Sequence, residues 1–307
     1  MRRTCLDCVY DLAQRDDRVV FVGSDLGPGV LEDMKQRLPD RWFMEGVAEQ
    51  HIVGMAAGLA MEGFIPYVNT IATFLSRRCY EQIVLDLCLH RLPVRLIANG
   101  GGVVYAPLGP THLATEDIAI LRCVPNMTIV APCDADEMIR FMSASLDWPN
   151  PIYIRLAKGG DEVVSREENG FSIGKAIMLR EPGEALFVTT GIMTQRAMIA
   201  AELLSGQGIR AGVLHMHTIK PLDHQALLEA TTGVELVLTA EEHTLVGGLG
   251  SAVIEALNEF GLMGSTKVTR MGLPDAFAPE YGSQDSLLQS WRLDSDSLAA
   301  RVRDELS

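Results

Sequence analysis

The feature that most constrains the fold is a regular alternation of short apolar runs with longer stretches of helical periodicity. In the first half, strands are expected at 19–22, 66–68, 94–98, 128–131 and 152–156, and helices at 48–62, 80–89, 116–121 and 134–146. In the second half, strands are expected at 185–189, 211–215, 235–238 and 266–271, and helices at 194–204, 223–231 and 247–259. Continuous apolar runs that alternate with helices are typical of parallel strands buried on both faces. The sequence therefore predicts an α/β fold of two domains, each a largely parallel sheet covered by helices.

A polar, glycine-rich stretch separates the two series. It covers residues 157–170 and has the composition of a linker. The 307 residues are 48% hydrophobic, which is enough for two separate cores. We therefore expect one domain at 1–160 and a second at 171–307.

Charge and composition exclude several classes of protein. The formal net charge of −14 disfavours nucleic acid and anionic membranes as partners. No stretch approaches 18 apolar residues and the first residues lack an apolar signal region, so a cytoplasmic protein is expected. Cys5 and Cys8 have CxxC spacing, but no second pair follows, and they lie in an amphipathic stretch. That context favours packing over a zinc or redox site.

Chemistry is suggested first by residues 45–63, EGVAEQHIVGMAAGLAMEG. Glu49 stands at the start of a helix that is rich in alanine and glycine, and these small residues allow close packing. From periodicity alone, Glu49 is an acid that the helix dipole favours at an N-terminus.

Several motifs in order give a more specific interpretation. GVAEQH (46–51), TIATFLSRRCYEQIV (70–84) and GPTHLATEDIAILRCVPNM (109–127) resemble the pyrimidine-binding domain of transketolase-like enzymes. TIKPLD (218–223) and EEHTLVGGLGSAV (241–253) resemble the C-terminal domain of the same family. The resemblance covers almost the whole chain. It implies one subunit of a thiamine-diphosphate enzyme that transfers a two-carbon ketol unit from a ketose or 2-oxo donor to an aldehyde-type acceptor.

The resemblance also assigns roles to individual residues. It implies that Glu49, kept protonated by burial, donates to N1′ of the cofactor's aminopyrimidine and favours the tautomer that activates thiazolium C2. Phe74 corresponds to the aromatic residue that stacks on this ring, and Ile71 stands where many transketolases have a second aromatic residue. His112 corresponds to a histidine that faces the substrate and can move a proton, whereas His51 is expected to act only indirectly.

Substrate recognition departs from the family pattern. Leu108 stands where an aspartate usually binds a substrate hydroxyl, and Gly100 where a histidine is common. Lys158 aligns with a phosphate-binding arginine, and Arg3 aligns loosely with another phosphate ligand. Lysine pairs with phosphate as a point charge and not as a two-pronged fork. We therefore expect a substrate other than the pentose phosphates.

Half of the cofactor site is expected on another chain. The family holds the diphosphate through Mg²⁺ on a GDG…N-type motif, and the sequence has no such motif. The resemblance thus implies an N-terminal, diphosphate-binding partner subunit that carries the Mg²⁺ ligands. It also implies a dimeric core of this chain and a heterotetramer with two partner chains.

Alternative functions remain open at this point. A pyruvate-decarboxylating enzyme similar to deoxyxylulose phosphate synthase fits the motifs about as well, and the beta subunit of a 2-oxo acid dehydrogenase is a third enzyme. A regulatory subunit on the same fold is the non-enzyme alternative, disfavoured because Glu49 is present.

The GGLG run at 247–250 suits a tight turn before a helix better than an anion site, and Glu242 and His243 are expected to be structural.

Overall fold

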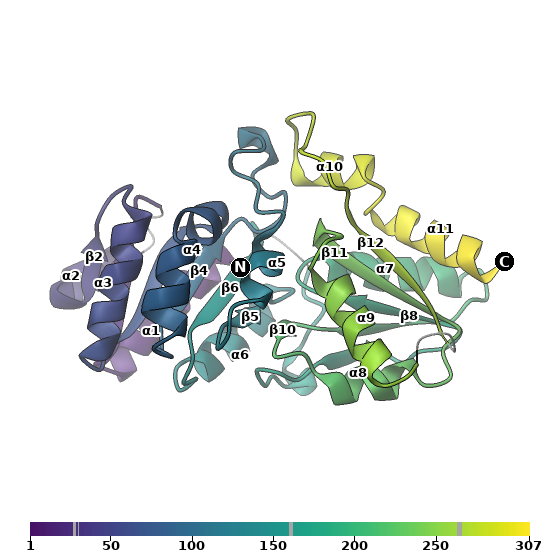
Figure 1. The fold of residues 1–307 in the computed structure, drawn as a ribbon, viewed down its shortest axis with the longest axis horizontal. Helices are drawn as coiled ribbons and strands as arrows, with labels where there is room; N and C mark the ends of the chain where they lie inside the picture. Colours follow the sequence, from purple (N-terminus) through teal and green to yellow (C-terminus); the bar gives the residue numbers. More distant parts are fainter. Residues whose placement is uncertain (27–28, 30, 160–161, 263–265) are drawn as a thin grey trace.

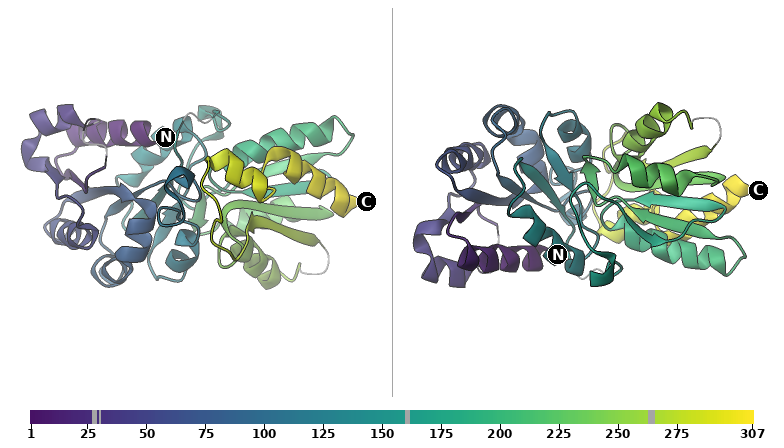
Figure 2. Two further views of the ribbon diagram at one scale, coloured as in Figure 1. Left: turned by 90° about the horizontal axis from the view of Figure 1, so that it is seen from above. Right: turned by 90° about the horizontal axis from the view of Figure 1, so that it is seen from below.

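The protein has two parallel-rich sheets, each flanked by helices, placed end to end along the long axis of the molecule (Figure 1). The computed structural model describes residues 1–26, 29, 31–159, 162–262 and 266–307. Both views of Figure 2 show that the first half of the chain builds one domain and the second half the other. The predicted α/β fold class with two domains is confirmed.

The first sheet has seven strands in the order β10-β5-β6-β4-β3-β1-β2. All neighbours are parallel except β10 and β5. Its strands are β1 (Val19–Gly23), β2 (Trp42–Met44), β3 (Ile65–Ile71), β4 (Arg95–Asn99), β5 (Thr128–Val130), β6 (Ile152–Leu156) and β10 (Thr218–Lys220).

Helices cover both faces of this sheet because alternate strand residues are apolar on each side. Helices α1 (Arg2–Arg15) and α6 (Ala135–Ser145) pack on the face that contains Phe21 and Ile154. Helix α3 (Glu49–Met61) and the segments that follow β3 pack on the face that contains Val22 and Leu96. The other helical segments described in this half are α2 (Glu32–Arg37), α4 (Tyr80–Gln82), α5 (Asp117–Arg122), the 3-10 turns η1 (Pro39–Arg41) and η4 (Ala106–Leu108), and the π-helical turns η2 (Phe74–Arg78) and η3 (Ile83–Cys88).

The second sheet has five strands in the order β12-β11-β8-β9-β7, of which only the pair β7 and β9 is antiparallel. Helices α7 and α11 cover one face, and α8 and α9 cover the other. The elements are β7 (Ile177–Arg180), β8 (Ala185–Thr189), α7 (Met193–Ser205), β9 (Ala211–His215), α8 (His224–Thr231), β11 (Leu236–Thr244), α9 (Leu249–Glu259), β12 (Lys267–Leu273), α10 (Gln284–Ser290) and α11 (Ser295–Leu306).

The two halves are joined more closely than a linker requires. Strand β10 comes from the second half of the chain, yet it pairs with β5 of the first sheet. The predicted linker, of which residues 160 and 161 lie outside the described part, is fastened to α6. The Asp134 carboxylate accepts the backbone N–H groups of Val164 (2.8 Å) and Ser165 (2.7 Å), and Arg140 donates to the Gly170 carbonyl (3.2 Å). These contacts hold the connection as a strap against the first domain.

Most expected strands and helices are found within a few residues of their predicted limits. The short strands β2, β7 and β10 and the helices α2, α10 and α11 are not predicted by the sequence analysis. A strand of three or four residues shows no clear period, so only pairing with a neighbour defines it.

Two expectations from composition can be compared with the structure directly. Cys5 and Cys8 lie on α1, Cys5 is fully buried, and burial raises the pKa of Cys8 to about 11, so both thiols are packing residues. Within the described ranges, no helix is long and apolar enough to cross a bilayer.

Candidate active site

The predicted site residues gather where the first sheet's strands end. Glu49 begins α3, shortly after β2; Phe74 follows β3; and His112 lies in the long loop between β4 and α5. Carboxyl ends of parallel strands meet at one edge of a sheet, which is where open α/β sheets bind ligands. The topology therefore brings together three motifs that are far apart in the sequence.

Glu49 is a buried carboxylate with a cationic partner. Its side chain is only 1% exposed, as predicted for an acid inside the fold. The guanidinium of Arg78, from the end of the π-helical turn η2, donates from Nη1 to Glu49 Oε2 in a short contact. Burying an unpaired charge is costly, so this ion pair explains how the carboxylate is accommodated.

Phe74 lies between Arg78 and His112. The Arg78 guanidinium carbon sits 4.5 Å from the centre of the Phe74 ring, within cation–π range. The His112 ring meets the edge of Phe74 at a centroid distance of 5.3 Å and an interplanar angle of 62°. Thr111 Oγ1 and His112 Nδ1 are 2.9 Å apart and share a hydrogen bond. The expected stacking, proton-transfer and acidic side chains thus form one continuous group.

A cavity of about 370 Å³ opens beside this group, lined by Thr73, Phe74, Arg77, Arg78 and Thr111. The buried Thr73 hydroxyl has no hydrogen-bond partner among the described residues. A buried hydroxyl without a partner is unusual in a native protein, and it is consistent with a ligand that completes the site. A flat, polar heterocycle fits this combination of aromatic face, buried acid and open hydroxyl.

Arg77 borders the same cavity but is held in place. Its Nη2 donates to Glu116 Oε2 at 2.9 Å and to the Leu113 carbonyl at 3.0 Å. Burial alone would raise the pKa of Glu116, but the hydrogen bonds and charge of Arg77 outweigh it and lower that pKa. Arg77 therefore braces the loop that carries His112.

The structure explains one departure from the family pattern. Gly100 has φ of +77°, and a Cβ atom there would lie 2.2 Å from the ring of Tyr105. No larger side chain fits at position 100 while Tyr105 occupies that space. Leu108, the second departure, is 50% exposed. Neither position therefore offers the polar side chain that the family pattern predicts.

The remaining predicted residues lie on several different elements. Ile71 is half-buried at the end of β3, three residues before Phe74. His51 is largely exposed, with its Nε2 3.9 Å from Glu45. Arg3 is 86% exposed and contacts Asp7 on its own helix, and Lys158 is exposed just after β6. No contact in the described part of the chain ties Arg3 or Lys158 to the group around Phe74.

The second domain braces the loop of the first. Glu242 accepts the backbone N–H of Val103 (2.8 Å) and the side-chain amide of Gln284 (2.9 Å). Glu241 accepts the N–H groups of Leu249 (2.6 Å) and Gly250 (2.8 Å) at the start of α9. The carboxylate of Glu241 therefore occupies the N-terminus of α9, where the GGLG run could otherwise bind an anion. Burial raises the pKa of both glutamates.

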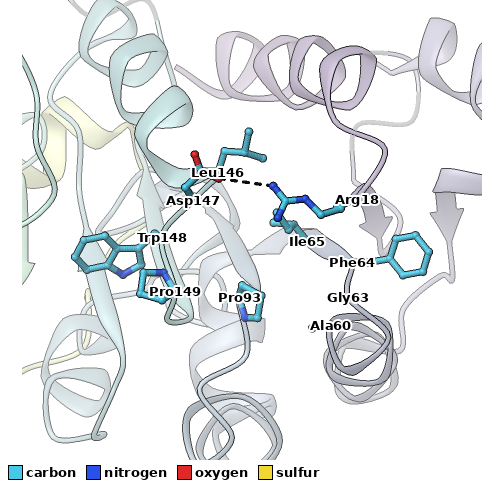
Figure 3. Close-up of a pocket in the computed structure, with 10 residues that line it drawn as sticks. All are labelled: Arg18, Ala60, Gly63, Phe64, Ile65, Pro93, Leu146, Asp147, Trp148 and Pro149. Carbon is cyan, nitrogen blue, oxygen red and sulfur yellow. Dashed lines mark ion pairs between the residues drawn. The ribbon is translucent and has the colours of Figure 1, made fainter.

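Two other features do not belong to this site. A cavity of about 230 Å³ lies at the opposite edge of the first sheet, where Arg18 precedes β1 and Ile65 begins β3; Figure 3 shows Arg18 and Asp147 facing each other there, 3.6 Å apart. Cys133, Glu137 and His215 form a buried cluster with metal-ligand spacing. Its sulfur and nitrogen donors do not suit Mg²⁺, which prefers oxygen, and Glu137 already accepts from the Cys133 N–H.

Comparison with known proteins identifies the family. The transketolase pyrimidine-binding domain matches residues 1–160, and the transketolase C-terminal domain matches residues 174–298. The chain belongs to the transketolase family. It is similar to a solved split-gene transketolase, an inactive β4 tetramer, with a TM-score of 0.90, 33% identity, and coverage of 99% of this chain and 97% of that one.

Two curated relatives refine this membership. The 6-deoxy-6-sulfo-D-fructose transketolase subunit of a Clostridium species is 37% identical over 294 residues, which cover 95% of this chain and 90% of that protein. The 1-deoxy-D-xylulose-5-phosphate synthase of Caldanaerobacter subterraneus is 37% identical, but this chain spans only 46% of its length. This transketolase-type chain thus matches split subunits nearly end to end, and family membership implies thiamine diphosphate as cofactor.

Sequence reasoning missed three residues that contact the candidate site: Arg77, Arg78 and Tyr105. Arg77 and Arg78 stand inside the TFLSRR motif, but nothing in the motif shows that one binds Glu116 and the other Glu49. Tyr105 fills the space beside Gly100. Glu242, which the sequence predicts to be structural, accepts the backbone N–H of Val103. The Arg-Arg pair beside an expected aromatic contact was the one available signal.

Proposed function

We propose that this chain is the cofactor-activating subunit of a split transketolase that transfers a two-carbon ketol unit. The observation that carries this proposal is the buried Glu49 beside Phe74, with His112 at the edge of the same ring. When bound, thiamine diphosphate supplies a carbon nucleophile at thiazolium C2 that attacks a carbonyl group. Glu49 would donate to N1′ of the pyrimidine, Phe74 would stack on it, and His112 would move a proton at the substrate oxygen.

The described residues fit the pyrimidine half of the cofactor but not the Mg²⁺-diphosphate half. Aromatic face, acid and unpartnered Thr73 hydroxyl are all present. We therefore propose an N-terminal partner subunit that holds Mg²⁺ and the diphosphate. A dimeric core of this chain, with domains at 1–160 and 171–307, would bind two partners in a heterotetramer.

The substrate is proposed to be less hydroxylated than a pentose phosphate, or to lack phosphate. Tyr105 fills the space beside Gly100, and Leu108 replaces a polar group. The exposed Arg3 and Lys158 are the candidate cations for an anionic end of the substrate. The sulfosugar transketolase subunit among the relatives supports the idea that such a chain can serve a donor other than a sugar phosphate.

The test is a purified complex of this chain with its partner, assayed with xylulose 5-phosphate, 6-deoxy-6-sulfofructose, unphosphorylated ketoses and pyruvate. Ketol transfer without CO₂ release supports the proposal. Release of CO₂ from pyruvate would favour the decarboxylating alternative. Calorimetry on the lone chain should find no sub-micromolar binding of thiamine diphosphate, because half of the site is missing.

A further inference from the structure

Arg78 makes both of the contacts that the proposed function reserves for the cofactor's aminopyrimidine. Its guanidinium donates to the Glu49 carboxylate and lies over the face of Phe74, 4.5 Å from the ring centre. These are the acid and the aromatic surface of the proposed pyrimidine site. The planar guanidinium of Arg78 therefore occupies the position in which the planar aminopyrimidine has to bind.

The chemistry of the guanidinium makes this overlap effective. A guanidinium is planar and delocalised, stacks on aromatic rings, and donates in its own plane to a carboxylate. An aminopyrimidine that stacks on Phe74 and accepts a proton at N1′ uses the same face and the same edge. Arg78 therefore has to leave this position before the aminopyrimidine can reach Phe74 and Glu49.

Arg78 is able to leave, and its neighbour Arg77 is not. The side chain of Arg78 is 43% exposed and borders the 370 Å³ cavity. Within the described ranges its only hydrogen bond is to Glu49. Arg77, one residue earlier, is tied to Glu116 and to the Leu113 carbonyl. The two adjacent arginines therefore have different tasks, one fixed and one displaceable.

We propose that Arg78 is a built-in competitor for the aminopyrimidine site, and that its displacement sets the apparent affinity of the chain for the cofactor. This inference rests on the proposed function of Glu49 and Phe74. When the binding-competent form is only a fraction of the population, the apparent dissociation constant is the intrinsic one divided by that fraction. Removing the competitor should therefore tighten binding.

The decisive variants are Arg78→Gln, which removes the charge and the flat cation, and Arg78→Lys, which keeps the charge but loses the planar stack. Arg180→Gln is a matched control, because Arg180 also pairs with one glutamate, Glu202 at 2.9 Å, but in the second domain. Calorimetry measures the Kd of thiamine diphosphate, with Mg²⁺, for each variant in complex with the partner subunit. NMR titration of the lone chain with 4-amino-5-hydroxymethyl-2-methylpyrimidine tests the pyrimidine site by itself.

Arg78→Gln should bind both probes about tenfold more tightly than the wild type, on the order of magnitude expected for a site that is one-tenth free. Arg78→Lys should fall between the two, and Arg180→Gln should match the wild type. Circular dichroism checks that each variant is folded. If Arg78→Gln does not fold, the comparison of Arg78→Lys with the wild type decides the question.

Equal or weaker binding by the folded Arg78 variants would overturn the proposal, since Arg78 would then be a bystander or a cofactor ligand. If the wild-type complex binds no thiamine diphosphate at all, the proposed function is wrong, and the proposal that Arg78 competes with the cofactor is wrong as well. The two failures are distinguishable, because the first leaves wild-type binding intact.

Discussion

A buried glutamate lies near the carboxyl edge of each sheet, and the two glutamates have different kinds of hydrogen-bond partner. In the first domain, Glu49 pairs with the half-exposed Arg78, which borders an open cavity. In the second domain, Glu241 at the end of β11 accepts two backbone N–H groups from the start of α9. One acid depends on a movable side chain, and the other is held by rigid backbone.

On the proposed function, this difference separates the edge that holds the cofactor from an edge that supports the fold. Two backbone N–H groups already satisfy the Glu241 carboxylate, whereas Glu49 relies on the part-exposed Arg78 beside the cavity. The second domain uses its acids to brace the first, as Glu242 does for the backbone at Val103. A shared architecture therefore says little about which edge carries chemistry.

The largest effect is expected from Glu49→Gln in the assembled enzyme. The amide keeps the shape and can still donate to N1′, but it has no acidic proton to share. We expect turnover and hydrogen–deuterium exchange at thiazolium C2 to fall by roughly 10²–10⁴-fold. Glu62→Gln, an exposed change just after the same helix, is the control. C2 exchange at the wild-type rate would show that Glu49 is not the activating acid.

His112→Gln should have the next largest effect. Glutamine retains a hydrogen-bond donor but cannot relay a proton, so we expect kcat to fall on the order of 10²-fold while cofactor affinity changes little. The exposed His90→Gln serves as the matched control. Steady-state kinetics across a pH series checks this prediction. A variant with unchanged kcat would leave His112 as a packing partner of Phe74.

Glu241→Gln sharpens the other side of the comparison, because its effect should appear in stability and not in chemistry. An amide group can accept only one of the two N–H groups of α9 well and turns its own N–H groups toward the other. We expect a loss of about 1–3 kcal/mol in the free energy of unfolding. Urea denaturation measures it, with the exposed Glu235→Gln as control. A turnover loss as large as that of Glu49→Gln would contradict the division between the two edges.

The last prediction concerns acid stability at the junction of the domains, where the effect per pH unit is small. Burial lowers the pKa of His217 to about 3, and its ring stacks on Phe171 at a centroid distance of 4.1 Å. A depressed histidine pKa means that the unfolded chain binds more protons between pH 6.5 and 3, so stability falls as the pH drops through this window. One such group contributes at most about 1.4 kcal/mol per pH unit.

His217→Gln should therefore flatten the decline in stability between pH 6.5 and 4, as measured by urea denaturation at each pH. The exposed His224→Gln should leave the slope unchanged. An identical pH slope in wild type and His217→Gln would mean that groups other than His217 govern the acid response in this window. Burial would raise the pKa of Glu137, but His215 outweighs it and lowers that pKa from 4.5 to about 2, so the stability that Glu137 contributes is lost as the pH falls from 4.5 to about 2, mostly below the window of this test.

Periodicity was sufficient to predict both sheets, because parallel strands buried on two faces leave a clear apolar pattern. Motif order was sufficient to select Glu49, Phe74 and His112, which the fold then brings to one edge. The same reasoning did not reveal the role of β10, which leaves its own half of the chain to pair with β5. A strand of three residues has too little pattern to predict that it pairs with a strand of the other domain.

By itself, the sequence determined the α/β class, the family and the residue types available for chemistry, since these depend on local pattern and motif identity. Only the tertiary structure decided what each group contacts. Arg78 reaches Glu49 across 29 residues, and Glu242 reaches Val103 across 139, and neither distance in sequence predicts the contact. The physical reason is that burial makes a charged side chain take whichever partner the packed elements place beside it. Side chains from distant segments therefore determine which partner each buried acid has.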